Sequence, residues 1–458
     1  MYQINFNKPE HIHFIGIGGI SMSGLAEILL GAGFPISGSD AKPSTLTAHL
    51  EGMGAKVFYG QCAENISADY NCVVYTAAIH PDNPEFARCV ELELPMLSRA
   101  ELLGQIMKNY STAIAVSGTH GKTTTTSMFS SVLLAADTDP TISVGGILEA
   151  IGGNIRVGKS ETFITEACEY TNSFLSFYPT LSIILNIEED HMDFFKDLDD
   201  IMNSFRLFAE KLPKNGTLII NQEIKDYEKI TEGLACHVIT YGMDPSCTYH
   251  AENVFFNEQG YGEFDVFHQD VNLGHIVLSV PGQHNVSNAL SVIAAARKLG
   301  ISMNCIREGL SGFRGANRRF QYKGTLNGVT IIDDYAHHPT EISVTLDSVK
   351  MRYPNRKVVA LFKPHRASRV RYFAQEFADA LSKADVVGVC DFTSIDDFDD
   401  GTDITIQYLT DRIEGCYVFH ETDEEAMLLA SMSPCVYVFM SSKDIYPFKE
   451  KVKRYQKS

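Results

Sequence analysis

The chain has 458 residues, of which 45% are hydrophobic and 21% charged, so it is long enough for about three ordinary globular domains. Its net charge of −19 argues against a general nucleic-acid-binding protein, and a bound anion must be attracted by local basic groups. The N-terminus lacks the basic stretch and apolar core of a signal peptide, and no apolar run approaches a membrane span. The ten cysteines form no C-x-x-C pair, which is typical of reduced thiols. We therefore expect a cytoplasmic protein that binds neither nucleic acid nor a membrane.

The first hundred or so residues alternate between strand and helix patterns. Apolar strands are predicted at 11–18, 34–40 and 71–79, and a helix at 21–33. Such alternation builds a parallel sheet with helices on its faces.

A glycine-rich turn, GIGGISMSG at 16–24, separates the first strand from the first helix. Its backbone could approach a pyrophosphate, although Ser21 stands at the sixth position, where the dinucleotide fingerprint has glycine. If Ser21 begins the helix, its hydroxyl can cap it. Asp40 closes the second strand, where an acid could bind a ribose hydroxyl. An ordinary tight turn and a nicotinamide dehydrogenase both remain open on this evidence.

A second α/β unit begins after a break near 109–111. Its first strand, 112–118, runs into GTHGKTTTT, a turn that opens a helix. Backbone N–H groups and the helix dipole make such a turn an anion site. Lys122 would add charge at the β/γ-phosphates, and the Thr123 hydroxyl could hold Mg²⁺. The loop is shortened, because Val116 stands where the strict motif has glycine and Gly118 is the first glycine. The alternative is an ordinary strand–turn–helix connection.

Acidic residues follow two further strands of this unit, 163–168 and 181–187. Carboxyl ends of parallel strands share the edge where ligands bind, so acids and a histidine there could hold a divalent metal. Mg²⁺ prefers oxygen ligands, and a histidine is more natural with Mn²⁺. N-capping of the following helices is the alternative. The candidates are Glu166, Glu169, Asn186, Glu188, Asp190, His191 and Asp193.

The remainder divides into a hairpin, a helix and a third α/β unit. Alternation in 250–280 predicts an antiparallel hairpin packed on the central domain, and 282–300 predicts a helix. From about residue 321, strands are predicted at 328–334, 357–364, 384–392 and 435–442. Arg318 and Arg319 lie where the second unit meets the third. Arginine pairs suit bidentate capture of a carboxylate or phosphate, and a surface ion pair is the alternative.

Together these motifs resemble those of the Mur ligases, ATP-dependent amino-acid ligases of peptidoglycan synthesis. The resemblance covers nearly the whole chain and rests on GIGGISMSGLAEILL, SGSD, SGTHGKTTTT, NIEEDHMD, GQHNVSNALSVIAA, GANRRFQ, DDYAHHPTEI and KPHRASR, all in family order. It implies three consecutive α/β domains. These are a Rossmann-like UDP-sugar domain (1–109), a central P-loop ATPase-like domain (110–320) and a Rossmann-like amino-acid-binding domain (321–458).

The implied reaction is ATP-dependent ligation of L-alanine to the carboxylate of UDP-N-acetylmuramate through an acyl phosphate. The alternative is a sister ligase that adds a preformed peptide to the same sugar. A dehydrogenase would leave the second loop unexplained, and a non-catalytic nucleotide-binding regulator would not need the metal acids. The cofactors would be ATP and Mg²⁺, with Mn²⁺ as the other candidate, and the protein is expected to be a monomer or weak dimer.

The resemblance also implies site residues. Lys122, His191 and Arg318 would be catalytic, with Arg318 the member of its pair that reaches the γ-phosphate. ATP would contact Gly118, Thr119, His120, Gly121, Lys122, Thr123, Thr124, His284, Asn288, Arg318 and Asp334, and the metal Thr123, Glu166 and His191. The UDP-sugar and alanine would contact Gly16, Gly18, Gly19, Ile20, Ser21, Asp40, Tyr335, His337, Arg366 and Arg369.

Two details of this assignment stay open. The family stretch often reads E-A-D-E-S-D, and here it is EACEYTN, with Cys168 in place of an acid, so either Glu166 or Glu169 could hold the metal. Arg366 and Arg369 are three residues apart, so if they are helical they share a face and can converge on one anion.

Overall fold

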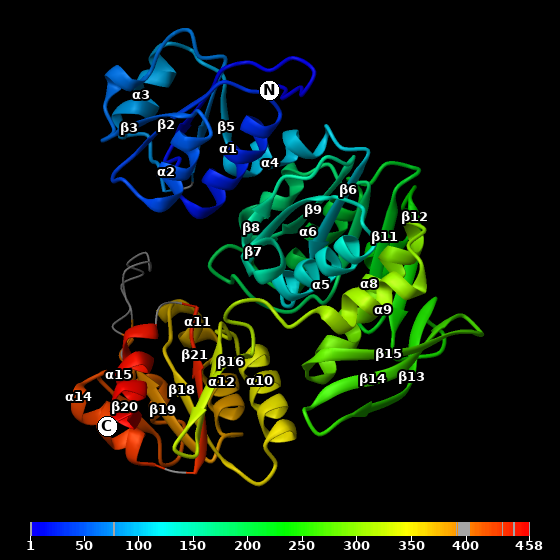
Figure 1. Ribbon diagram of the computed structural model, residues 1–458, viewed down its shortest axis with the longest axis vertical. Coiled ribbons are helices and arrows are strands. Elements are labelled where there is room, and N and C mark those ends of the chain that lie inside the picture. Colours follow the sequence, from blue (N-terminus) through cyan, green and yellow to red (C-terminus); the bar gives the residue numbers. More distant parts are fainter. Residues whose placement is uncertain are drawn as a thin grey trace.

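The computed structural model describes residues 2–76, 78–390, 392, 404–432, 434–442 and 445–457. These residues form three β-sheets with helices packed on them, one after another along the chain (Figure 1). The predicted fold class of three consecutive α/β units is confirmed. No helix in these ranges is long and apolar enough to cross a membrane.

The first sheet is entirely parallel, in the order β3-β2-β1-β4-β5. Its strands are β1 (Ile12–Ile15), β2 (Ile36–Asp40), β3 (Lys56–Tyr59), β4 (Cys72–Tyr75) and β5 (Met96–Ser98). The helices are α1 (Ile20–Gly31), α2 (Thr45–Gly52), α3 (Pro84–Glu91) and α4 (Arg99–Met107), with a short η1 (Ala63–Asn65). The strand order reverses between β1 and β4, and such a switch point opens a crevice at the carboxyl ends of the strands.

The second sheet has ten strands, in the order β15-β14-β13-β12-β11-β10-β6-β9-β7-β8. They are β6 (Thr112–Ser117), β7 (Thr141–Leu148), β8 (Gly153–Arg156), β9 (Thr162–Ala167), β10 (Leu181–Ile184), β11 (Thr217–Asn221), β12 (His237–Gly242), β13 (Tyr249–Phe256), β14 (Tyr261–His268) and β15 (Val271–Pro281). Its helices are α5 (Lys122–Ala135), η2 (Glu149–Ile151), η3 (Tyr170–Ser176), α6 (Leu198–Ala209), α7 (Glu228–Thr231), α8 (Gln283–Lys298) and α9 (Met303–Gly312).

The predicted hairpin at 250–280 differs from the structure in two respects. It has three antiparallel strands, β13 to β15, and it continues the central sheet instead of packing on it. The join is a parallel pairing of β12 with β13, which pairs Tyr241 with Tyr249. Pairing satisfies the backbone groups of β12, which would otherwise form an open edge.

The third sheet has the order β16-β17-β21-β18-β19-β20 and is parallel except for the β16–β17 pair. The strands are β16 (Gln321–Leu326), β17 (Val329–Asp334), β18 (Lys357–Phe362), β19 (Val386–Cys390), β20 (Tyr417–Phe419) and β21 (Cys435–Met440). The helices are α10 (Pro339–Arg352), α11 (Ala367–Tyr372), α12 (Ala374–Leu381), α13 (Gln407–Thr410), α14 (Asp423–Ser431) and α15 (Tyr446–Lys457).

The hydrophobic cores show how the three units are joined. One cluster runs from β1 and α1 into the central unit, where Tyr110 stacks on Phe163 with ring centroids 5.2 Å apart. Helix α1 also packs closely on β8. Gly24 of α1 leaves no room for a side chain, because a Cβ there would collide with Ile155 of β8. The third sheet is packed in clusters of its own. The predicted domain limits at 109/110 and 320/321 fall in the connections between sheets and stay predictions.

Candidate active site

The turn between β6 and α5 is held by the end of β10. The Thr119 and His120 N–H groups donate to the carbonyl and side chain of Asn186, at 3.1 and 2.7 Å. Gly118 and Gly121 have φ values of 141° and 85°, which side chains other than glycine rarely adopt. Gly121 caps α5, so the N-terminus of this helix faces the turn. The predicted anion site is therefore preformed.

Lys122, the first residue of α5, is partly buried, with its side chain 15% exposed, and ion-paired. Its Nζ donates to the Glu169 carboxylate at 2.9 Å and to the Thr119 carbonyl at 3.0 Å. Burial disfavours the charged ammonium, but Glu169 outweighs it, so the pKa of Lys122 is raised. The cation is thus held at the turn by an acid that was predicted as a metal ligand.

The other acid, Glu166, lies beside the predicted metal-binding hydroxyl. Thr123 Oγ1 donates to Glu166 Oε2 at 3.0 Å, and the Gly145 N–H donates to the other carboxylate oxygen. A hydroxyl and a carboxylate next to a phosphate loop are the oxygen donors that Mg²⁺ takes. The donor set therefore fits such an ion, with Glu166 the acid next to Thr123 and Glu169 the partner of Lys122.

His191 is the third predicted metal ligand and belongs to a stack of rings. Its imidazole lies 4.3 Å from the Tyr170 ring, and its Nε2 lies 3.9 Å from Glu169. Burial lowers the pKa of His191 to about 4, so the ring is neutral at pH 7. Its Nδ1 is buried without a hydrogen-bond partner in the described part of the chain. A neutral ring with an unpaired nitrogen fits a metal ligand.

A cluster that the sequence did not predict joins the phosphate loop to α10. His120 Nε2 lies 3.5 Å from Glu188, and its Nδ1 lies 3.5 Å from Glu341. Burial opposes protonation of His120, but the two nearby acids outweigh it and raise its pKa to about 9. His338 is close enough to complete a three-ligand group with His120 and Glu188. A protonated imidazole has no free nitrogen lone pair, so His120 in this state pairs with the acids and does not coordinate a metal.

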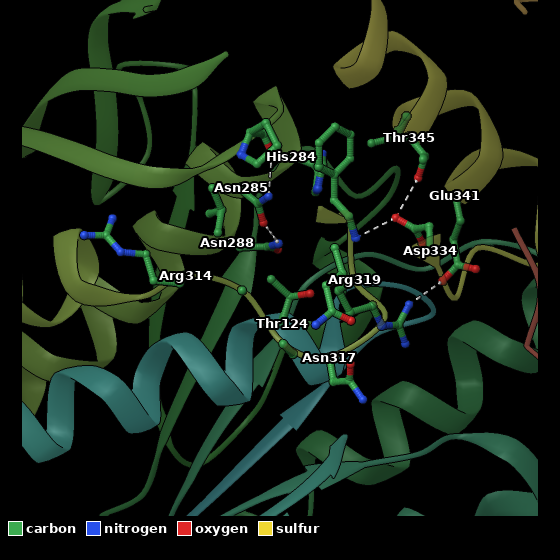
Figure 2. Close-up of a pocket in the computed structure, with 18 of the residues that line it drawn as sticks. Thr124, His284, Asn285, Asn288, Arg314, Asn317, Arg319, Asp334, Glu341 and Thr345 are labelled. Carbon is green, nitrogen blue, oxygen red and sulfur yellow. Dashed lines mark hydrogen bonds and ion pairs between the residues drawn. The ribbon is translucent and has the colours of Figure 1, made fainter. Parts of the chain in front are cut away.

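A pocket of about 890 Å³ lies next to this turn, between the central and third sheets. His284, Asn285 and Asn288 project into it from the start of α8 (Figure 2). Asn285 accepts from Asn288 at 3.2 Å and donates to the Pro281 carbonyl. Burial lowers the pKa of His284 to about 4, so it offers one donor and one acceptor. The two predicted ATP contacts His284 and Asn288 thus line one wall.

The opposite wall comes from the third unit and carries Asp334 and Arg319 (Figure 2). Asp334 Oδ2 accepts the Phe320 N–H at 2.8 Å, and burial raises the pKa of this carboxyl to about 6. Arg319 lies 3.5 Å from Glu341. Arg318, the predicted γ-phosphate ligand, is not among the lining residues; its NH2 donates to the Ser441 carbonyl at 2.7 Å. In this structure Arg319, and not Arg318, faces this pocket.

The residues predicted to surround an amino acid lie at the same junction. His337 contacts the Tyr335 ring edge-on, and its N–H donates to Glu341 at 3.0 Å. Arg369 donates from Nε and NH2 to Asp190 Oδ1, at 3.1 and 2.8 Å.

The two arginines do not share a helix face as expected. Arg366 precedes α11 as its N-cap, and it donates to Asp193 at 3.2 Å while Arg369 binds Asp190. The two side chains point to different carboxylates because α11 begins only at Ala367, so Arg366 lies outside the helix. Arg366 also lies over the Tyr170 ring, 5.1 Å from its centroid. The two guanidinium groups therefore flank the 188–193 segment and contact separate carboxylates.

The glycine turn of the first sheet follows β1 at the switch point. Asp40 accepts the Gly18 N–H at 2.8 Å, and Gly16 has a φ of 83°. The expectation that Ser21 caps the helix is wrong, because α1 begins at Ile20 with Gly19 as its cap. Ser21 lies inside the first turn, and its hydroxyl accepts from Arg99.

Several lining residues were missed by the sequence analysis. They are Asn285, Arg314, Asn317, Thr340, Glu341 and Thr345. Most of them belong to the quoted motifs GQHNVSNALSVIAA, GANRRFQ and DDYAHHPTEI, so the motifs located the pocket without singling them out.

Comparison with known proteins assigns each unit to a family model. Residues 11–111 match "Mur ligase family, catalytic domain", 116–296 match "Mur ligase middle domain" and 318–436 match "Mur ligase, glutamate ligase domain". UDP-N-acetylmuramate–L-alanine ligases from Lachnospira eligens and Agathobacter rectalis are each 59% identical. The match to the first covers 84% of both chains, and the match to the second covers 85% of both.

Two solved structures cover almost the whole chain. A UDP-N-acetylmuramate–alanine ligase from Thermotoga maritima has a TM-score of 0.77 at 30% identity, covering 98% of this chain and 99% of that one. A murein peptide ligase from Psychrobacter arcticus has a TM-score of 0.70, covering 98% of each chain. At 24% identity, the second match shows the fold alone.

Proposed function

The chain belongs to the Mur ligase family, and on this premise we propose that it joins L-alanine to the carboxylate of UDP-N-acetylmuramate, converting ATP to ADP and phosphate. The observation that carries the proposal is 59% identity with relatives named for this reaction, over 84% of both chains. The preformed phosphate loop and the adjoining pocket support it, because they offer sites for a triphosphate and its base.

The chemistry explains why ATP is needed. A carboxylate is a poor acyl donor, since its leaving group would be oxide, and transfer of the γ-phosphoryl group converts it to an acyl phosphate. The free amine of alanine then attacks, and phosphate leaves from the tetrahedral intermediate. Phosphoryl transfer depends on positioning and charge neutralisation more than on covalent help.

Lys122 would provide one of these charges, moving its ammonium from Glu169 toward the β/γ-phosphates. Thr123 and Glu166, with His191 nearby, would hold Mg²⁺, or Mn²⁺ in its place. A bound divalent ion neutralises phosphate oxygens. The third cation would be one of the neighbouring arginines Arg318 and Arg319. The resemblance implies Arg318, but Arg319 is the one that lines the pocket, so we favour Arg319.

The amino acid would bind where the central and third units meet. Arg366 and Arg369 carry the guanidinium groups that match a carboxylate, and they already lie against the 188–193 segment. An α-amino group has a pKa of about 7.7–8.0, so part of the substrate is unprotonated without a strong base. The bond from Thr340 to Glu188, at 2.6 Å, helps to close this junction against water, which would hydrolyse an acyl phosphate.

Two further features of the protein belong to this proposal. We infer a cytoplasmic location, where ATP is available, and a monomer or weak dimer as the working form.

The sister reaction, addition of a preformed peptide to the same sugar, is the competing function. Relatives named for L-alanine at 59% identity favour the single amino acid.

Phosphate release tests the proposal directly. The enzyme is supplied with ATP, Mg²⁺ and UDP-N-acetylmuramate, and single amino acids are compared with a tripeptide. We expect release with L-alanine and little with the tripeptide; release only with the tripeptide would assign the sister function. Omission of the nucleotide sugar is the matched control, because an uncoupled ATPase would continue without it.

A further inference from the structure

Tyr170 contacts one residue of the proposed metal site and one residue of the proposed alanine site. It follows Glu169, the partner of Lys122, at the start of η3. Its ring is stacked on the His191 imidazole, with the centroids 4.3 Å apart and the planes inclined by 24°. The Arg366 guanidinium group lies over the same ring, 5.1 Å from its centroid. One side chain of the central unit therefore contacts groups that belong to two different ligands.

No short hydrogen bond fixes the plane of the His191 imidazole in the described part of the chain. Nδ1 is buried without a hydrogen-bond partner, and oxygens of Asp190 and Glu169 lie 3.8 and 3.9 Å from Nε2. A metal-binding imidazole is ordinarily oriented by a hydrogen bond from its second ring nitrogen. In this protein the stacked Tyr170 ring takes that part, because offset aromatic rings attract each other at this separation.

The hydroxyl of Tyr170 supports the other site. It donates to Asp193 Oδ2 at 2.9 Å, and Arg366 NH1 donates to the same oxygen at 3.2 Å. A cation over an aromatic face is also attracted by the ring quadrupole. The ring face and the shared acceptor thus hold the guanidinium group at two points. Arg366 lies outside α11, so these contacts replace the support that a helix would give.

The backbone that carries Tyr170 is held in place by its neighbours. Thr171 and Asn172 have φ values of 53° and 57°, in the left-handed region. The Ser204 hydroxyl of α6 donates to the Asn172 side chain, and the Ser173 hydroxyl donates to the Tyr170 carbonyl at 2.7 Å. A ring on such a segment is a fixed support for the side chains that lie against it.

We propose that Tyr170 is a positioning residue for the ligation, whose ring orients His191 and whose hydroxyl orients Arg366 through Asp193. This inference rests on the proposed function. The two parts of the side chain act on different ligands. The ring acts on the metal through His191, and the hydroxyl acts on alanine through Arg366. Substitution can therefore separate their effects.

Three variants of the full chain test the proposal. Tyr170→Phe removes only the hydroxyl, and Tyr170→Leu removes the ring as well. Tyr417→Leu is the matched control, because it removes a ring that is 56% exposed on β20. The NMR resonances of the His191 ring, assigned by their loss in His191→Gln, are recorded without metal or nucleotide. Steady-state kinetics give kcat, the KM for alanine and the Mg²⁺ concentration at half-maximal rate.

The two substitutions at Tyr170 should behave differently. In Tyr170→Phe, we expect the His191 resonances to stay in place and the KM for alanine to rise about 2- to 10-fold, as for the loss of one hydrogen bond. In Tyr170→Leu, the resonances should move because the ring current is lost, and the Mg²⁺ requirement should also rise, about 10- to 100-fold. Tyr417→Leu should match the wild type in every readout.

Three results would overturn the inference. They are an unchanged KM for alanine in Tyr170→Phe, unmoved His191 resonances in Tyr170→Leu, and a fall in kcat alone, which would mark Tyr170 as a structural residue. Tyr170→Phe keeps the test decisive if Tyr170→Leu does not fold. Failure of the wild type to release phosphate with alanine and UDP-N-acetylmuramate would instead overturn the proposed function, while the His191 resonances test the stacking independently.

Discussion

At the turn before α5, the partly buried ammonium of Lys122 and the buried carboxylate of Glu169 depend on each other. Glu169 is 3% exposed, and its only short ion pair in the described residues is with Lys122, at 2.9 Å. Removing one member of such a pair leaves an uncompensated charge in a poorly solvated site. Lys122 therefore has a structural role in the ligand-free protein besides the role we propose with phosphate.

Replacement of Lys122 should affect both rate and stability. We expect Lys122→Ala to lower the ligation rate about 10²–10³-fold, the range found when one preorganised charge stabiliser is lost. It should also lower the free energy of unfolding by roughly 3–5 kcal/mol, because Glu169 stays buried. Steady-state kinetics and urea unfolding measure the two effects. The matched control is the double variant Lys122→Ala/Glu169→Gln, which should regain stability but not the ligation rate. Near-normal turnover of Lys122→Ala at saturating ATP would contradict the assignment.

Arg369 gives a second prediction at this scale. Its two bonds to Asp190 use the planar fork that lysine cannot reproduce, and both side chains are 8% and 7% exposed. We expect Arg369→Lys mainly to raise the KM for alanine, with smaller effects on the KM for ATP and for the UDP-sugar. Arg371→Lys, on the same helix, is the control. A loss confined to ATP affinity would make Arg369 a phosphate ligand instead.

Helix α5 depends on the backbone conformation that precedes it. Gly121 has a φ of 85°, and a Cβ there would lie 3.2 Å from Asn288 Oδ1. We expect Gly121→Ala to reduce stability by about 1–2 kcal/mol and to weaken ATP binding, because the turn must shift. Gly52→Ala, at the end of α2 with open space around it, should be neutral or stabilising. Thermal unfolding and ATP titration compare them; equal behaviour of the two variants would show that the turn tolerates a side chain.

Strand β1 carries an acid-sensitive group. His13 is fully buried, its Nδ1 pairs with the Ser37 hydroxyl at 2.9 Å, and burial lowers its pKa to about 3. The unfolded chain takes up this proton near its ordinary pKa of 6.5, so stability is lost as the pH falls from 6.5 toward 3. At pH 5 the loss is roughly 2 kcal/mol.

Hydrogen exchange of β1 amides measures this effect. We expect protection in the wild type to fall between pH 7 and pH 5, after correction for the intrinsic exchange rate. His13→Phe keeps a ring against Tyr70 but takes up no proton on unfolding. Its loss of protection should therefore be smaller, by the uptake of about one proton per unfolding event. The same slope in both proteins would assign the acid sensitivity to other groups.

For the molecule as a whole, the three sheets are not joined equally. The first and second share a hydrophobic cluster, and the third has its own. The 188–193 segment bridges to the third unit, where Glu188 accepts from Thr340 and the Glu189 carbonyl accepts from His338 at 3.1 Å. Ligand binding should therefore stabilise the parts unequally.

Ligand-dependent hydrogen exchange tests this organisation. At a concentration of about 100 Kd, UDP-N-acetylmuramate should stabilise the first sheet by roughly 2.7 kcal/mol and slow its amide exchange about 100-fold, with little change in the third sheet. ATP should instead protect the turn before α5. NADH serves as the negative ligand, and protection of the first sheet by NADH alone would favour a dehydrogenase.

The sequence by itself determined the features that depend on neighbouring residues. Strand and helix periodicity predicted three α/β units, and glycines marked the turns after β1 and β6 together with Lys122 and Thr123. The family resemblance added the reaction and some of the residues lining the two walls of the pocket, among them His284, Asn288 and Asp334. These signals are local patterns of side chains and backbone conformation, which a linear sequence displays directly.

The tertiary structure decided which charged groups meet. Lys122 and Glu169 are 47 residues apart, and Arg369 and Asp190 are 179 apart, so neither pairing has a sequence pattern. The same holds for the His120 cluster, for Arg319 facing the pocket and for Arg99 beside Ser21. Such contacts depend on how whole sheets and helices pack, because the position of one domain against another decides which charges meet across their junction.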